Sequence, residues 1–126
     1  MQIRTFIWLS VIAFVAIAAS VTRAADAPEK HFSMNITAGA LPVAERVMRV
    51  EKGDAVRLHI SSDGAGELHL HGYRLEASVV PHAPVELAFI ARATGRFPFE
   101  WHAAESKGRT GAHHAPPLAA IEVRPK

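Results

Sequence analysis

The sequence contains no cysteine among its 126 residues. This absence excludes disulfide bonds, cysteine-based zinc and iron–sulfur sites, covalently attached haem, thiol catalysis and thiolate-bound copper. Methionine is scarce, with only Met1, Met34 and Met48. Histidine is therefore the main basis left for a metal site. The length allows one ordinary domain.

The N-terminus has the pattern of a secretory signal peptide. Arg4 precedes an uncharged, mostly apolar run from Thr5 to Thr22, and Ala24 ends a stretch with small residues at the −3 and −1 positions of a cleavage site. We expect a signal peptide at 1–24 and a folded domain at 31–126, placed in the bacterial periplasm. The alternative is an uncleaved membrane anchor, although the run is slightly shorter than the ~20 residues of a spanning helix. Both alternatives place the domain outside the cytoplasm.

The charge of the exported chain is balanced. Removing residues 1–24 takes away two of the 14 basic residues, Arg4 and Arg23, and leaves 12 basic against 12 acidic residues. A neutral chain offers no overall electrostatic attraction for nucleic acid or anionic lipid. We therefore expect no nucleic-acid partner, and a membrane contact only if the signal segment is kept.

Short alternating segments dominate the rest of the sequence. Val56, Leu58 and Ile60 alternate with polar residues, which is typical of a half-buried strand. The same pattern occurs at 85–91 and 97–101, and weaker strands are expected at 31–37, 46–51, 67–77 and 118–124. About seven short strands separated by Gly- and Pro-containing turns predict an all-β fold, a two-sheet Greek-key β-sandwich.

All eight histidines follow the signal segment, and three segments carry the candidates for metal binding. His69 and His71 flank Leu70, so on a strand both imidazoles lie on the same face, about 6.6 Å apart along the chain. The predicted metal ligands are His69, His71, His102, His113 and His114. Neighbouring carboxylates that could add a ligand or orient an imidazole are Glu67, Glu100 and Glu105. Imidazole suits copper, zinc, nickel and iron. The alternative is that these histidines are polar residues of an exposed strand face and a solvated loop.

The sequence lacks the common catalytic motifs: it has no Gly-x-Ser-x-Gly, no His-Glu-x-x-His and no phosphate-binding glycine loop. An open three-histidine metal site could in principle activate water. Because no general base or substrate pocket can be argued from the sequence, we do not expect an enzyme.

The order of these segments resembles the cupredoxin-like family of secreted β-sandwiches, in particular its small bacterial periplasmic members. The resemblance runs from about residue 51 to residue 125. The matching segments are Glu67-Leu68-His69-Leu70-His71-Gly72-Tyr73, Val85-Glu86-Leu87-Ala88-Phe89, Gly95-Arg96-Phe97-Pro98-Phe99-Glu100-Trp101-His102 and Ile121-Glu122-Val123-Arg124-Pro125.

The resemblance implies ligand positions that this chain fills only in part. His71 stands where the family has its first copper-ligand histidine, before a strand that would begin at Gly72. The place of the copper-binding cysteine falls at Glu100 or Trp101, and the axial methionine has no counterpart. A blue-copper centre needs a Cu–thiolate bond, so this chain cannot build one, and electron transfer through such a site is excluded.

Two functions remain. The first is a periplasmic metal-binding protein that carries, buffers or delivers an ion, with copper expected first and zinc or another divalent ion as alternatives. It requires that the fold bring the histidine segments together at one end of the sandwich. The second is a metal-free accessory module that binds another periplasmic or membrane protein. In that case the histidines would be scattered.

Overall fold

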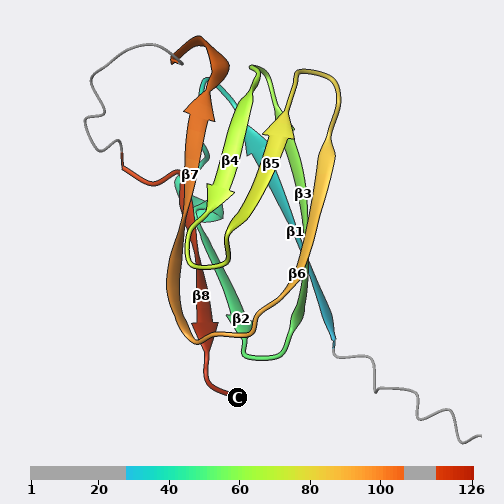
Figure 1. Ribbon diagram of the computed structural model, residues 1–126, viewed down its shortest axis with the longest axis vertical. Coiled ribbons are helices and arrows are strands. Elements are labelled where there is room, and N and C mark those ends of the chain that lie inside the picture. Colours follow the sequence, from blue (N-terminus) through green and yellow to red (C-terminus); the bar gives the residue numbers. More distant parts are fainter. Residues whose placement is uncertain (1–27, 107–115) are drawn as a thin grey trace, which may run out of the picture.

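The computed structural model describes residues 28–106 and 116–126, which form eight strands and two short 3-10 helices (Figure 1). The elements in chain order are β1 (Glu29–Ile36), η1 (Val43–Glu45), β2 (Val47–Glu51), β3 (Ala55–Ser62), β4 (Gly66–Leu70), β5 (Leu75–Val79), β6 (Val85–Ile90), β7 (Gly95–Ala103), η2 (Ala104–Ser106) and β8 (Ala119–Arg124). In these two ranges, no helix has the length and apolar character to cross a membrane. The expected signal segment and His113 and His114 lie outside the described residues.

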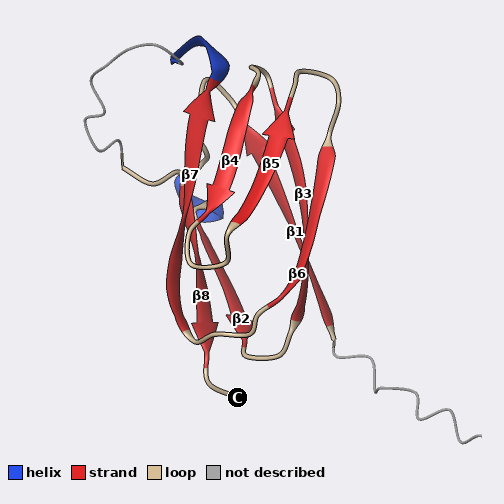
Figure 2. Cartoon of the chain, viewed as in Figure 1, coloured by secondary structure: helices blue, strands red, loops and turns tan. Residues whose placement is uncertain are grey.

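The strands, drawn in red in Figure 2, form two facing sheets. The smaller sheet has the order β1-β3-β6 and the larger one the order β2-β8-β7-β4-β5. The pairs β1–β3 and β2–β8 are parallel, and the other pairs are antiparallel. This arrangement confirms the expected all-β, two-sheet sandwich, with eight strands in place of about seven.

The hydrophobic core lies between the sheets and takes every second residue of most strands. Leu58, Ile60, Leu68 and Phe99 are all 0% exposed. Burying a side chain of this size contributes about 1.5–3 kcal/mol to the free energy of unfolding. Since side chains alternate between the two faces of a strand, the residues between these core positions project from the outer faces of the sandwich.

One sequence expectation was wrong: residues 67–77 form a hairpin, not a single strand. β4 ends at Leu70, a turn follows, and β5 begins at Leu75. Gly72 and Arg74 have positive φ angles of 82° and 55° in that turn. Buried residues have even numbers in β4 and half-buried or buried ones odd numbers in β5. This change of parity around Gly72 is the sequence signal that would have revealed the turn.

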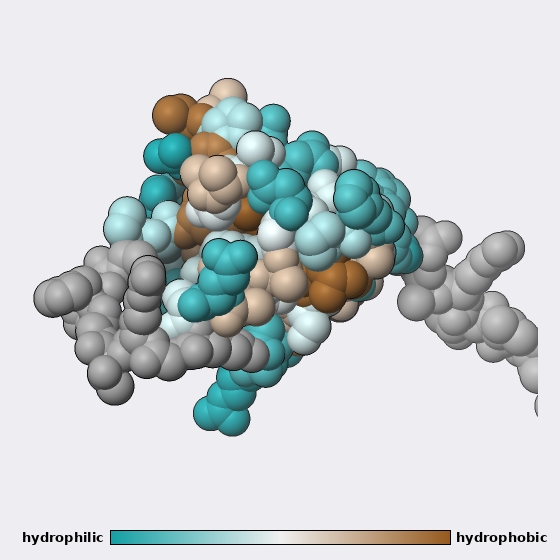
Figure 3. All heavy atoms as spheres, turned by 90° about the horizontal axis from the view of Figure 1, so that it is seen from above, coloured by the Kyte–Doolittle hydropathy of each residue, from teal (hydrophilic) through white to brown (hydrophobic). Residues whose placement is uncertain are grey.

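The apolar surface outside the core is divided. Within residues 28–106 and 116–126, the large hydrophobic residues that are exposed are Val43, Val80 and Ile90. Seen from above, hydrophobic residues form separate groups among hydrophilic ones (Figure 3). The exposed apolar residues therefore do not suggest a binding surface on this face.

Candidate metal site

The pairing of β4 with β7 brings two histidines and two glutamates onto one patch of the larger sheet. In the antiparallel register, Glu67 lies opposite His102, and His69 lies opposite Glu100. The intervening Leu68 is completely buried, so these four side chains project from the outer face. Directly opposed residues have Cβ atoms ~5 Å apart. The four side chains thus occupy the corners of a small rectangle.

The two imidazoles contact each other across the rectangle. The ring centroids of His69 and His102 lie 4.8 Å apart, and the rings meet edge to face at 82°. The pairing of β4 with β7 thus brings together His69 and His102, which come from separate segments of the sequence.

Glu100 links the two histidines of this patch that are most exposed. Its Oε2 atom lies 2.9 Å from Nε2 of His71 and 3.7 Å from Nε2 of His102. The side chains of His71 and His102 are both 51% exposed. One carboxylate oxygen is therefore shared by imidazoles from β7 and from the turn after β4.

His69 has two further carboxylates beside it and is less exposed, at 27%. Glu67 Oε2 lies 3.8 Å from its Nε2, and Glu76 Oε1 lies 3.4 Å from its Nδ1. Glu76 escaped the sequence analysis because it becomes the cross-strand partner of His69 only once β5 is recognised. A hollow of about 360 Å³ adjoins this group, lined in part by His69, His71 and Glu76.

The histidine and glutamate side chains of this patch lie close together, but they do not point toward one common position. In the described ranges, no three His, Asp or Glu side chains are placed so that they could together hold a metal ion. The described donors meet as a histidine pair and as histidine–carboxylate pairs.

The location of the patch corrects two expectations drawn from the sequence. His71 follows the last residue of β4 and is not followed by a strand beginning at Gly72. The backbone N–H of His71 donates to the carbonyl of Pro98, near the start of β7, whereas His102 is near the end of β7. The described candidates therefore extend along the outer face of the sheet instead of gathering at one end of the sandwich.

Trp101 takes a different direction from its neighbours Glu100 and His102. Its indole packs over Gly39 and Gly66, where a Cβ on Gly66 would lie only 2.4 Å from the ring. The two possible positions of the family's cysteine are thus filled by an outward carboxylate and by an aromatic ring that is part of the packing.

The remaining described histidines lie elsewhere. His31 and His59 stack with ring centroids 6.4 Å apart on the outer face of the smaller sheet, a pairing that the sequence analysis missed. His59 lies at an outward position of β3, and its side chain is 52% exposed. His82 lies in the turn between β5 and β6 with a φ of 62°.

Arg57 organises the charges around that second histidine pair. It hydrogen-bonds to Glu29 at 2.8 Å and also to Glu86, and these bonds raise the pKa of its guanidinium. The Arg57 hydrogen bond is the main cause that lowers the pKa of Glu29 below its usual value. Because Arg57 engages both carboxylates and places a positive charge between them, this face is less suited to a divalent cation than the face that carries His69 and His102.

Comparison with known structures identifies the architecture. The chain superposes on a multicopper oxidase with a TM-score of 0.57 at 17% identity, covering 78% of this chain and 43% of that one. The chain has the cupredoxin-like fold. A copper nitrite reductase from Nitrosomonas europaea matches with a TM-score of 0.54 at 19% identity, over 77% of this chain and 42% of that chain. An apo copper-binding protein matches with a TM-score of 0.51 at 9% identity, over 78% and 97%.

These similarities establish the fold alone. The cupredoxin-like chain described here spans about two fifths of the multicopper oxidase. No protein-family model matches it, and no curated protein matches it by sequence.

Met34 and Met48 are buried in the core, at 0% and 4% exposure, so neither offers its sulfur to the outer-face patch.

Proposed function

We propose that this protein binds a divalent metal ion, Cu(II) in the first place, on the outer face of the larger sheet, and carries, buffers or delivers it in the periplasm. The observation that supports this most is the contact between the imidazoles of His69 and His102, at 4.8 Å between ring centroids. Two imidazoles so close together are a natural starting pair for one ion, since Cu–N and Zn–N bonds are ~2 Å long.

Carboxylate oxygens would complete the ligand set. Glu100 already lies within 4 Å of both His71 and His102. Small rotations of the side chains would be needed to turn the donors toward one point, because they do not converge in the absence of metal. The exposed fractions of these side chains, 51% for His71 and His102 and 41% for Glu100, leave room for such rotations.

The chemistry of the donors favours Cu(II) over Cu(I). Imidazole and carboxylate ligands suit tetragonal Cu(II), whereas Cu(I) prefers thiolate and thioether sulfur. The chain has no cysteine. Zn(II) accepts the same donors, and the general order of stability places it below Cu(II). We propose binding and transfer, not catalysis, as the role of this ion.

The test compares two double variants that each remove two histidines from one outer face. His69→Ala/His102→Ala disrupts the proposed site, and His31→Ala/His59→Ala is the matched control on the smaller sheet. The purified protein is titrated with Cu(II) and Zn(II) by calorimetry against a competing chelator. We expect the site variant to lose at least about tenfold in Cu(II) affinity, while the control binds like the wild type. A site variant with unchanged affinity would refute the proposal.

A third variant, His113→Ala/His114→Ala, tests the two predicted ligands outside the described residues. If it weakens binding as much as the site variant does, the loop contributes to the same ion. If the control variant alone loses affinity, the metal site is on the smaller sheet, and the assignment to His69 and His102 is wrong.

A metal-free accessory module is the second candidate. It is favoured by the contacts that the histidines already make with carboxylates, and by the lack of a convergent set of three donors among the described residues. Under this alternative, the wild type binds neither Cu(II) nor Zn(II) above background in the same titration.

A further inference from the structure

One end of the sandwich collects positive charge. At this end lie the start of β1, the β2–β3 turn, the β6–β7 loop and the end of β8 (Figure 1). Backbone hydrogen bonds hold these segments together. The N–H of Lys52 donates to the carbonyl of Arg124 at 2.8 Å, and the N–H of Gly53 donates to the carbonyl of Ala91 at 2.9 Å. We call this surface the basic end, and its exposed cations are Lys30, Lys52, Arg92, Arg124 and Lys126.

The cations of the basic end are not neutralised by ion pairs. None of the five forms an ion pair with a carboxylate in the described part of the chain. Arg92 lies over the ring of Tyr73, 5.2 Å from its centroid, a contact that leaves its charge uncompensated. Two carboxylates, Glu51 and Asp54, are nearby, and Asp54 is 2% exposed and accepts a hydrogen bond from the N–H of Glu51. Positive charge therefore predominates at this surface.

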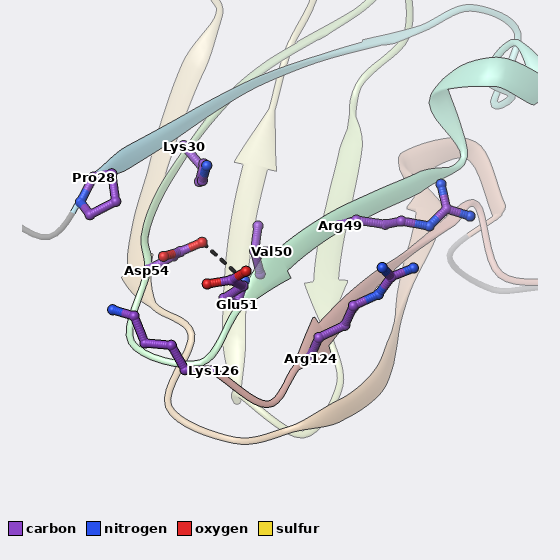
Figure 4. Close-up of a pocket in the computed structure, with 8 residues that line it drawn as sticks. All are labelled: Pro28, Lys30, Arg49, Val50, Glu51, Asp54, Arg124 and Lys126. Atoms are coloured by element: carbon purple, nitrogen blue, oxygen red, sulfur yellow. Dashed lines mark hydrogen bonds between the residues drawn. The ribbon is translucent and has the colours of Figure 1, made fainter.

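A cleft of about 260 Å³ opens within the basic end (Figure 4). It lies between Lys30 of β1 in the smaller sheet and the β2 and β8 strands of the larger one. The residues that line it are Pro28, Lys30, Arg49, Val50, Glu51, Asp54, Arg124 and Lys126. Arg49 also pairs with Glu122 at 3.1 Å, which leaves Lys30, Arg124 and Lys126 as the unpaired cations of the cleft. The carboxylates of Glu51 and Asp54 lie between these three cations in Figure 4, so lipid phosphate groups would contact the cations at the rim of the cleft and not inside it.

The described part of the chain begins at the basic end, where Pro28 lines the cleft. The surface next to Pro28 is the basic end, whose charge is complementary to anionic lipid.

We propose that the basic end binds the phosphate headgroups of an anionic membrane surface. The contact is electrostatic and reversible, and it leaves the outer face that carries His69 and His102 free. This proposal does not depend on metal binding. The zero net charge expected for residues 25–126 gave no indication of this basic surface, because a net charge does not show how the charges of opposite sign are distributed over the surface.

The test is vesicle co-sedimentation of the protein recovered from the cell envelope, with its N-terminus determined by mass spectrometry. Vesicles of pure phosphatidylcholine are compared with vesicles that contain phosphatidylglycerol, at low and high salt. We expect tighter binding to the anionic vesicles, and a loss of this preference at high salt because counterions screen the contact. If the protein remains anchored by an apolar N-terminus, the anchor binds both kinds of vesicle alike. Its contribution then cancels in the ratio of the affinity for anionic vesicles to the affinity for phosphatidylcholine vesicles.

Two double variants remove equal charge from different places. Lys30→Gln/Lys126→Gln should lower the preference for anionic vesicles by about 25-fold at most, on the basis of about fivefold for each cation near the surface. The control Arg46→Gln/Arg74→Gln, whose cations are outside the basic end, should bind like the wild type. Equal losses in both variants, or no loss in the first, would overturn the proposal. Tighter binding to duplex DNA than to anionic vesicles at the same salt concentration would assign the basic end to nucleic acid and likewise overturn it.

Discussion

Glu100 shares one carboxylate oxygen between His71, at 2.9 Å, and His102, at 3.7 Å. The two histidines are 31 positions apart in the sequence, and the hydrogen-bonded pairing of β4 with β7 brings them to the same carboxylate. This oxygen therefore lies within 4 Å of both imidazoles. Under the proposed function it becomes a ligand or orients one.

Replacing this carboxylate should weaken metal binding without disturbing the fold. We expect Glu100→Gln to lower Cu(II) affinity by roughly 10- to 100-fold, because the neutral amide is a poorer ligand and a poorer acceptor for imidazole N–H groups. Calorimetric titration measures the effect. The control is Glu45→Gln, a change of equal charge in η1, away from the patch. Equal affinity for Glu100→Gln and Glu45→Gln would remove Glu100 from the site.

The ion pair between Glu29 and Arg57 predicts an acid-dependent loss of stability. The pKa of Glu29 is lowered in the folded protein, chiefly by its hydrogen bond with Arg57. The pair therefore stabilises the protein above the ordinary pKa of 4.5, and this contribution is lost as the pH falls through the lower folded value. Urea unfolding should show Glu29→Gln less stable than wild type at pH 6, with the difference disappearing well below pH 4. A difference that persists in acid would contradict this origin.

Gly66 should not tolerate a side chain. A Cβ there would lie 2.4 Å from the Trp101 ring and 2.7 Å from the carbonyl oxygen of His102. We expect Gly66→Ala to lower the free energy of unfolding by roughly 1–3 kcal/mol, since the backbone contact cannot be relieved by a side-chain rotation. Gly64→Ala is the control, because a Cβ at that position meets nothing within 4 Å. Equal stability of the two variants would show that the strand and the indole move apart readily.

Tyr73 ties the β4–β5 turn to the β6–β7 loop. Its hydroxyl donates to the carbonyl of Ala93 at 3.1 Å and accepts from the N–H of the same residue at 3.2 Å. Tyr73→Phe keeps the ring packing against Phe89 and Phe97 but leaves two backbone groups without this partner. We expect a loss of about 1–2 kcal/mol in urea unfolding. A neutral effect would mean that water replaces the hydroxyl at this position.

The sequence predicted the sheets better than their connections. Alternation correctly placed the core positions of β3, β6 and β7, because one buried face imposes a period of two. The turn at His71–Arg74 was missed because a single glycine and a change of parity are weak signals against a long run of alternating residues. The grouping of His69 with His102 depends on which strands pair, and Glu76 joins His69 through a second pairing. Long-range register of this kind leaves no local mark in the sequence.

The position of β4 gives the candidate site a rigid base. β4 is paired along its whole length with β5 on one side and with β7 on the other, whereas β7 pairs with β8 only from Gly95 to Phe99. Backbone amides of a strand paired on both sides exchange their hydrogens slowly, through openings that approach global unfolding, while edge strands open locally. We therefore expect the backbone that carries His69 to exchange more slowly than the end of β7 that carries Glu100 and His102. A rearrangement on binding an ion would then move the β7 side of the site toward His69.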